Sequence, residues 1–279
     1  MSMSIPKVSR TSSSISGAGR IVLPLVSSWM LGISVMTRHR LYARAQRCNK
    51  ECVAISDSMP GSVRSMKVYG FPISPFVRKV HLVAAEKGVP VELALSNPAD
   101  PAAEFLAASP FRKIPALVDG DFTLCDSTAI VTYLDAIQPE PPITPGDAKA
   151  KAKAIWFEEF ADTILIAAGG KIMFNRFVSP KLMGKPGDEA MAQQGERELE
   201  PILAYLESQC GDGWLAGDDF SIGDIAVAAT FRSLGYVGLE PNPETHPRTA
   251  AWYARVKARP SWGPVAALED KIVSRALGG

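Results

Sequence analysis

Cysteine and histidine are scarce in this sequence. Its 279 residues include four cysteines and three histidines. So few cysteines exclude a disulfide-dense secreted scaffold and fit a reducing compartment. Cys48 and Cys52 form a C-N-K-E-C pair, but no second Cys/His pair lies nearby to complete a metal site. We therefore expect no bound metal.

Long hydrophobic runs and a strong net charge are also missing. The longest mostly apolar run, Ile21–Met36, is 16 residues long and is interrupted by Pro24 and Gly32. A membrane-spanning helix needs about 20 such residues, so stable membrane insertion is not expected. The net charge of +1 provides no general attraction to nucleic acid.

Acidic residues are absent from the first 50 positions, which are also rich in serine. Residues 1–65 carry nine Lys/Arg and two acidic residues, whereas residues 66–279 have a net charge of −6. This break predicts a basic extension that ends near Met66. It could be an organelle transit segment, a signal sequence or a start placed too early. The last is favoured, because a complete domain opens at Met66.

The length and an ordinary 47% hydrophobic content predict two domains. Residues 66–138 show the order β-α-β, a connection, then β-β-α, with an Asp119–Gly120 turn typical of a hairpin. This order predicts a four-stranded mixed sheet with helices against it. The expected strands are Met66–Gly70, Val89–Leu95, Ile114–Val118 and Phe122–Cys125; the helices are Phe76–Lys87, a short one within 97–108, and Ser127–Ile137.

A proline-rich linker, Gln138–Gly146, precedes a second domain over residues 147–279, in which no alternating strand pattern occurs. We predict an all-helical bundle there. Ser221 and Asp224 have the spacing of a capping box, and the apolar helix that they open should be the buried centre of the bundle. The expected helices are Asp147–Phe177, Asp188–Cys210, Ser221–Leu234, Pro247–Ala258 and Trp262–Ala276.

Three motifs resemble the cytosolic glutathione transferases: YGFPISPFVRKV (Tyr69–Val80), SPFRKIPALVDGDFTLCDSTAI (Ser109–Ile130) and WLAGDDFSIGDI (Trp214–Ile225). The resemblance covers Met66 to about Lys271. It implies a thioredoxin-like domain followed by an all-helical domain, with glutathione as co-substrate and a homodimer as the assembly.

Ser74 is the expected catalytic residue, because it matches the thiol-activating position of the Ser-type classes. A hydroxyl at the start of the first helix can donate a hydrogen bond to a thiolate, and the helix dipole favours the same charge. The alternative is that Ser74 only caps the helix. Tyr69 is a rival for the catalytic role, because some classes use an early tyrosine.

The resemblance assigns further positions to glutathione binding. Ile114, before a cis-Pro115, would pair its backbone with the cysteinyl amide. Asp126 and Ser127 suit the γ-glutamyl ammonium and carboxylate, although a simple helix cap would explain them as well. The other expected contacts are Phe76 and two cations for the glycine carboxylate, Lys113 and Arg112, the latter at a position where the family often has glycine.

The resemblance also implies that the electrophile lies between the two domains, against the loop Phe71–Phe76 and the first long helix of the bundle. Candidates on that helix are Trp156, Phe160, Leu165, Met173 and Phe174. For Trp156 and Phe160 a place in the bundle core is the favoured interpretation.

The predicted function is conjugation of the glutathione thiolate to a hydrophobic electrophile, in a cytoplasmic enzyme. An organelle location is the alternative if residues 1–65 are a transit segment. A glutathione-dependent lyase, isomerase, dehalogenase or peroxidase would share the same motifs. A non-catalytic binding module on this fold is the alternative from another class of protein.

Overall fold

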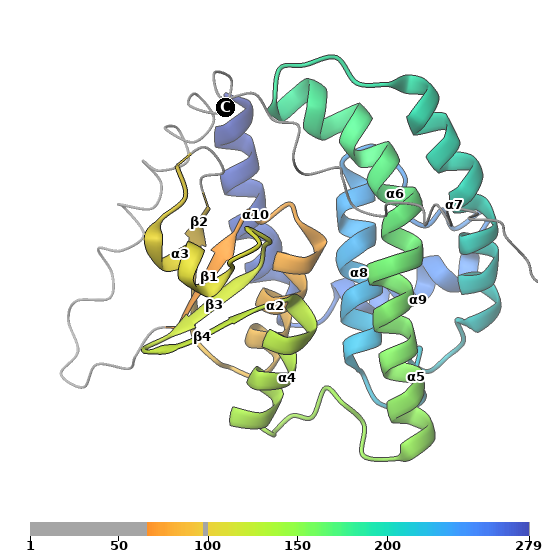
Figure 1. The fold of residues 1–279 in the computed structure, drawn as a ribbon. Coiled ribbons are helices and arrows are strands. Elements are labelled where there is room, and N and C mark those ends of the chain that lie inside the picture. The colour runs from red at the N-terminus through yellow and green to blue at the C-terminus, as the bar shows by residue number, and fades with distance from the viewer. Residues whose placement is uncertain (1–65, 97–99, 279) are drawn as a thin grey trace, which may run out of the picture. The chain divides into compact units, whose positions relative to one another are not determined.

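The computed structural model describes residues 66–96 and 100–278, which lie in one compact unit (Figure 1). The predicted extension 1–65, with Cys48 and Cys52, lies outside the described residues.

The first half of the described chain forms the predicted four-stranded mixed sheet, in the order β2-β1-β3-β4. The strands β1 and β2 are parallel, and the other two pairings are antiparallel. The strands are β1 (Met66–Gly70), β2 (Val91–Leu95), β3 (Ala116–Asp119) and β4 (Phe122–Cys125). The strands β1 and β4 have the predicted bounds, whereas β2 and β3 each start two residues later than predicted and β3 ends one residue later. Pro115 explains the late start of β3, because it has no N–H to donate to the ladder. The hairpin loop is Gly120–Asp121, one residue later than expected, and Gly120 has a φ of +64°.

Helices cover both faces of this sheet. Successive side chains of a strand point to opposite faces, so Val68 packs with α2 (Pro75–Glu86) and α4 (Ser127–Ile137), and Tyr69 packs with α3 (Ala103–Ala108). This is the predicted thioredoxin-like arrangement of a β-α-β unit and a β-β-α unit.

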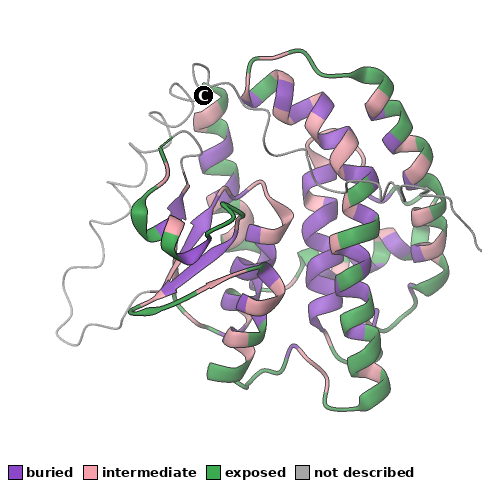
Figure 2. Cartoon of the chain, viewed as in Figure 1, coloured by how far each residue is buried: buried purple, intermediate pink, exposed green. Residues whose placement is uncertain are grey.

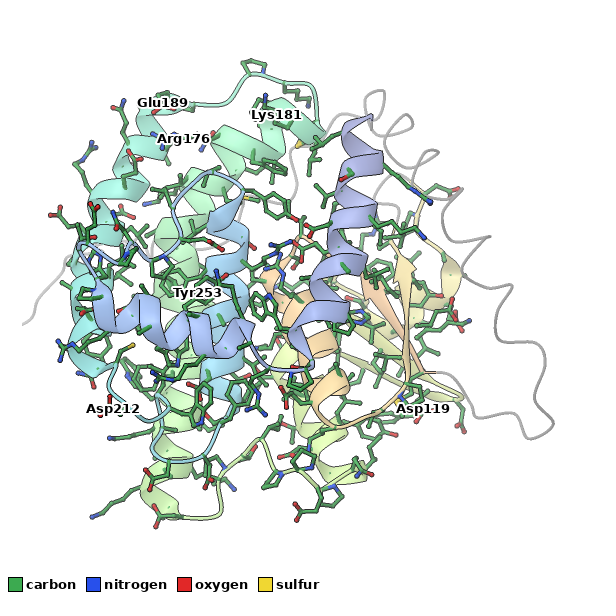
Figure 3. The ribbon with its side chains drawn as sticks, turned by 180° about the vertical axis from the view of Figure 1, so that it is seen from behind. Asp119, Arg176, Lys181, Glu189, Asp212 and Tyr253 are labelled. Atoms are coloured by element: carbon green, nitrogen blue, oxygen red, sulfur yellow. The ribbon has the colours of Figure 1, made fainter. Side chains whose placement is uncertain are left out.

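The second half is helical throughout, as predicted. The expected helix over 147–177 continues to Leu182, and two π-helical segments interrupt its α-helical hydrogen bonding. The elements are α5 (Ala148–Glu159), η2 (Phe160–Leu165), α6 (Ile166–Met173), η3 (Phe174–Leu182), α7 (Glu189–Gln209), α8 (Ile222–Gly235), α9 (Pro247–Lys257) and α10 (Trp262–Leu277). Arg176 of η3 pairs with Glu189 at the start of α7 at 2.6 Å, and Figure 3 labels both side chains.

The helix α8 is the buried centre of the bundle, as its apolar sequence predicts (Figure 2). The Ser221 side chain and the Asp224 side chain form the predicted capping box. The Asp224 carboxylate also accepts hydrogen bonds from the Leu215 N–H at 3.0 Å and the Trp252 indole at 2.8 Å. One buried carboxylate therefore fixes the start of α8, the preceding loop and α9 together.

The two halves share one hydrophobic core. Val80 and Val83 of α2 belong to the same buried cluster as Ile225 and Ala229 of α8. The segment between the halves is held as well: Lys87, at the end of α2, donates to the carbonyls of Gln138 at 2.7 Å and Pro141 at 2.8 Å. The position of the sheet relative to the bundle is thus fixed by packing and not by a free linker.

Candidate active site

Ser74 stands directly before the first turn of α2, as the N-cap residue. Its side chain makes no capping hydrogen bond, and its Oγ is buried without a partner among the described residues. An unpaired buried hydroxyl is costly in a folded protein, typically about 1–3 kcal/mol. Helix capping therefore does not account for this side chain, and its hydroxyl can still donate a hydrogen bond.

The surroundings of Ser74 favour negative charge. The first N–H groups of a helix lack partners within the helix, and the helix dipole places its positive end there. The Ser74 carbonyl already accepts the Arg78 N–H at 3.0 Å, so the helix starts at this residue. A thiolate placed at this end would gain from the hydroxyl and from the dipole together.

Tyr69, the rival candidate, is turned to the other face of the sheet. It is 7% exposed and packs against Phe105 of α3, with ring centroids 5.8 Å apart. Its hydroxyl donates to the Glu104 carboxylate. Since α3 and α2 cover opposite faces, this hydroxyl is not directed at the start of α2.

The Ile114–Pro115 peptide bond is cis, as expected. No other described residue hydrogen-bonds to the N–H or C=O of Ile114, so both groups are available to a ligand. The buried Ser109 hydroxyl shapes this loop, because it donates to the Lys113 carbonyl at 2.7 Å and accepts the Lys113 N–H at 2.9 Å. Ile114 and Phe71 pack against the same apolar cluster, which brings this loop to the one before Ser74.

Arg112 and Lys113 are both exposed, and neither pairs with a carboxylate of the described chain. Arg112 has a φ of 58°, a left-handed conformation that glycine adopts without steric cost. This explains why glycine suits the position. Here the chain carries a cation in a conformation unfavourable for any side chain.

Asp126 and Ser127 lie at the start of α4. The Asp126 Oδ1 accepts the N–H groups of Thr128 at 2.9 Å and Ala129 at 3.4 Å, so the predicted capping role is real. The Asp126 Oδ2 and the Ser127 N–H remain without partners among the described residues. Asp126 also has a positive φ, of 81°. Capping and ligand binding are therefore compatible at this site.

A buried charge cluster connects the start of α4 to α2. Lys79 is 1% exposed, and its ammonium lies 2.9 Å from Glu158 and 2.5 Å from Asp162. Glu158 also accepts the Thr128 hydroxyl at 2.8 Å. Burial raises the pKa of Asp162 to about 6, although the adjacent Lys79 lowers it. This cluster holds the Asp126–Ser127 corner against the helix that begins after Ser74.

Apolar side chains gather beside the Ser74 loop. Phe71 and Ile73 pack against a cluster that contains Met173 and Phe177, and Tyr236 stacks on Phe177 at 4.8 Å between centroids. The sequence singled out Met173 but missed Phe177 and Tyr236. No local signal marks Tyr236, which reaches this cluster only through the tertiary packing of α8.

The other electrophile candidates lie elsewhere. Phe160 and Leu165 are in the bundle core, 2% and 0% exposed. The core interpretation is wrong for Trp156, which is 45% exposed and donates to the Tyr205 hydroxyl at 2.9 Å. Trp156 lies on the solvent-facing side of α5, whereas Ala154 and Phe157 lie on the buried side. Phe174 is half-buried and is not part of the cluster beside Ser74, while Phe76, half-buried, occupies the first turn of α2.

Residues 66–96 and 100–278 carry neither a metal-ligand cluster nor a membrane-spanning helix. No cluster of three or more metal-ligating side chains occurs there. None of the helices in those ranges has the length and apolarity to span a membrane.

Family models of glutathione S-transferase match the chain in two parts, the N-terminal domain over residues 68–142 and the C-terminal domain over residues 167–260. Glutathione S-transferase 3 of Zea mays is 33% identical over 208 residues, which cover 71% of this chain and 91% of the relative. The chain belongs to the glutathione S-transferase family.

The chain is also similar to two further proteins of different description. The solved maize glutathione S-transferase I, in complex with an atrazine glutathione conjugate, has a TM-score of 0.67 and 27% identity over 74% of this chain and 98% of that one. FtsZ-localized protein A of Caulobacter vibrioides is 31% identical over 72% of this chain and 90% of the relative. The chain is thus similar both to a glutathione S-transferase solved with a glutathione conjugate and to a protein named for its location at FtsZ.

Proposed function

We propose that this glutathione S-transferase conjugates the glutathione thiolate to a hydrophobic electrophile, with Ser74 as the catalytic residue. The observation that carries the proposal is the buried Ser74 hydroxyl at the start of α2, which has no partner in the part of the chain that the structure describes. A charge-assisted hydrogen bond is worth about 1.5–3 kcal/mol, and lowering a thiol pKa by one unit needs about 1.4 kcal/mol. One hydroxyl at a helix start is therefore enough to hold much of the bound thiol ionised at neutral pH.

Glutathione would be held at its three polar parts by separate loops. The γ-glutamyl carboxylate would bind the Ser127 N–H and hydroxyl, and its ammonium the Asp126 Oδ2. The backbone of Ile114, preceding Pro115, would pair with the cysteinyl amide. Arg112 and Lys113 would bind the glycine carboxylate. Each of these groups is unpartnered or exposed in the structure, which supports this assignment.

The electrophile would lie against the apolar side chains beside Ser74, which include Phe71, Met173, Phe177 and Tyr236. Phe76 would border glutathione from the first turn of α2. The thiolate sulfur attacks the electrophilic carbon, and the leaving group departs with the bonding electron pair. Catalysis then consists of positioning the two reactants and stabilising the thiolate.

We also propose a homodimeric, cytoplasmic protein with a glutathione-binding domain over residues 66–138 and a substrate-binding domain over residues 147–279. Phe111, which is 84% exposed beside Arg112, would be a contact residue of such a dimer. Size-exclusion chromatography of the wild type and of Phe111→Ser tests this. A monomeric wild type would refute it.

The central test is a titration of the full chain with glutathione, followed by calorimetry and by the ultraviolet absorption of the thiolate across pH. We expect binding with a depressed thiol pKa, and loss of that depression with retained binding in Ser74→Ala. Wild-type turnover of standard electrophiles by Ser74→Ala would remove Ser74 from the mechanism.

Two other functions are distinguished by the same titration. Thiol activation without transfer to aryl or alkyl electrophiles would favour a glutathione-dependent lyase, isomerase, dehalogenase or peroxidase. Absence of glutathione binding would favour a binding module, for which the similarity to FtsZ-localized protein A provides a precedent.

A further inference from the structure

The peptide group between Ile73 and Ser74 is held at both of its polar atoms. Its carbonyl oxygen accepts hydrogen bonds from the Ser233 hydroxyl at 3.1 Å and from the Arg78 Nη2 at 3.3 Å. Its N–H donates to the Phe71 carbonyl at 3.0 Å. A peptide group is planar, so fixing both atoms fixes the plane from which the Ser74 Cα extends.

All five N–H groups of the Arg78 guanidinium donate hydrogen bonds in this region. A guanidinium has five N–H groups. Two of them bind the Glu269 carboxylate, each at 2.6 Å, one binds the Ile73 carbonyl, one binds the Ser233 hydroxyl at 2.9 Å, and the last binds the Ala229 carbonyl. Arg78 is 2% exposed and Glu269 is 1% exposed, so the fork is buried and its geometry has no freedom to change.

Apart from Ile73, the partners of this guanidinium come from the helical half of the chain. Ser233 and Ala229 belong to α8, and Glu269 belongs to α10. The Tyr236 hydroxyl also donates to the Glu269 carboxylate, at 2.7 Å. The loop before Ser74 is therefore positioned by helices more than 150 residues further along the sequence.

Ser74 depends on this support more than an ordinary loop residue does. Its Oγ has no hydrogen bond to a described residue that could hold it, so the backbone and the χ1 rotamer built on it decide where the hydroxyl lies. Hydrogen bonds weaken steeply as their distance and angle depart from the optimum. A small displacement of the Ile73–Ser74 peptide would therefore weaken a bond from Ser74 to a thiolate without removing any group that touches glutathione.

We infer that Ser233 and Arg78 are positioning residues for Ser74, acting through the Ile73 carbonyl. Through this contact, helix α8 affects how far Ser74 lowers the pKa of the bound thiol. This inference rests on the proposed role of Ser74 and adds residues that make no contact with either substrate.

Ser233→Ala in the full chain tests the inference, because it deletes one donor to the Ile73 carbonyl. Thr230→Val is the matched control: Thr230 is a buried hydroxyl on the same helix, 2% exposed, and donates only to the Ala226 carbonyl within α8. Ser233→Thr restores the hydroxyl. For each variant, the pKa of the bound thiol, the KM for glutathione and kcat are measured, together with the carbonyl ¹³C shift of labelled Ile73.

We expect Ser233→Ala to raise the bound-thiol pKa by about half a unit to one unit and to lower kcat about three- to tenfold at a pH below that pKa, the effect of one weakened hydrogen bond. The KM for glutathione should change less than kcat. The Ile73 carbonyl shift should move in Ser233→Ala alone. Thr230→Val should keep the wild-type thiol pKa, and Ser233→Thr should return towards it.

A wild-type thiol pKa and an unmoved Ile73 carbonyl shift in a folded Ser233→Ala would overturn the inference. So would equal effects of Ser233→Ala and Thr230→Val, which would indicate a purely structural role. Failure of the proposed function gives a different pattern. In that case the wild type itself shows no depressed thiol pKa, or Ser74→Ala keeps it, and the positioning role is overturned as well.

Discussion

His81 makes the stability of this protein sensitive to acid in a way that can be calculated. It lies on α2, is 8% exposed, and its Nε2 has no hydrogen-bond partner among the described residues. It lines a small cavity with Leu93 and Leu268, and the charged groups there, Arg78 and Glu269, are paired with each other. Burial lowers the pKa of His81 from 6.5 to about 4.

The sign and size of the effect follow from this shift. The unfolded chain takes up a proton near pH 6.5, whereas the folded chain does so only near pH 4. Stability contributed by the neutral imidazole is therefore complete above pH 6.5 and is lost as the pH falls towards 4. At about 1.4 kcal/mol per pKa unit, the loss is about 2 kcal/mol at pH 5 and about 3 kcal/mol below pH 4.

Asp162 acts in the opposite direction, so the wild-type profile alone would be misleading. Burial raises the pKa of Asp162 from 3.8 to about 6, and the folded state therefore gains stability as the pH falls across that interval. The diagnostic quantity is the difference between the wild type and His81→Leu, which removes the titration at 81 and leaves Asp162 unchanged.

Urea unfolding from pH 7.5 to pH 4 measures this difference, with circular dichroism to confirm that both proteins are folded. We expect the free energy of unfolding of the wild type to fall relative to that of His81→Leu by about 2 kcal/mol between pH 7.5 and pH 5. Parallel profiles for the two proteins would refute the reasoning and show that His81 does not titrate as a buried neutral imidazole.

Three further substitutions test other parts of the structure. Lys79→Met should lower the free energy of unfolding by about 3–5 kcal/mol, because it leaves the buried Glu158 carboxylate uncompensated. Adding Glu158→Gln should recover part of this loss. An unchanged free energy of unfolding for Lys79→Met in urea would contradict this. Gly223→Ala should lower Tm, because its Cβ would lie 2.8–3.0 Å from atoms of α5, whereas the control Gly170→Ala, with nothing within 4 Å, should leave Tm unchanged or raise it. Arg112→Gly removes the strain of a side chain at a φ of 58° and should raise the free energy of unfolding by about 0.5–1 kcal/mol. The same variant should bind glutathione more weakly in calorimetry. Unchanged binding would exclude Arg112 as a partner of the glycine carboxylate.

The order of elements could be predicted from the sequence because it depends on local signals. The strands Met66–Gly70 and Phe122–Cys125 and the helix Ser127–Ile137 have their predicted bounds, because turn residues or a capping carboxylate stand beside each of them. The alternation of side chains in a strand and the helical period then decided which half holds the sheet. The β3 strand was predicted to start too early, because apolar character was counted at Ile114 and Pro115 without regard to the missing proline N–H.

The residues proposed to bind glutathione are also local in sequence. Ser74 and the Asp126–Ser127 pair stand at helix starts, and the Ile114 backbone precedes a proline, so each position has a motif of its own. The conformation of Arg112 could not be predicted, because arginine, unlike glycine or asparagine, gives no sequence signal for a positive φ. Trp156 was misplaced for a related reason: a large apolar side chain favours burial, but only the packing of α5 against α8 shows which side of the helix is outside.

The sequence by itself determined the two-part architecture, the family and the candidate catalytic serine, since each of these rests on patterns that span a few residues to a few turns of helix. The tertiary structure alone decided what surrounds that serine. It showed that the Ser74 hydroxyl lacks a partner among the described residues, that Tyr69 faces α3, and that Arg78 and Ser233 donate to the Ile73 carbonyl, with Arg78 held in place by Glu269. Such contacts join residues up to 191 positions apart, as between Arg78 and Glu269, and they exist only because the sheet and the bundle pack into one core.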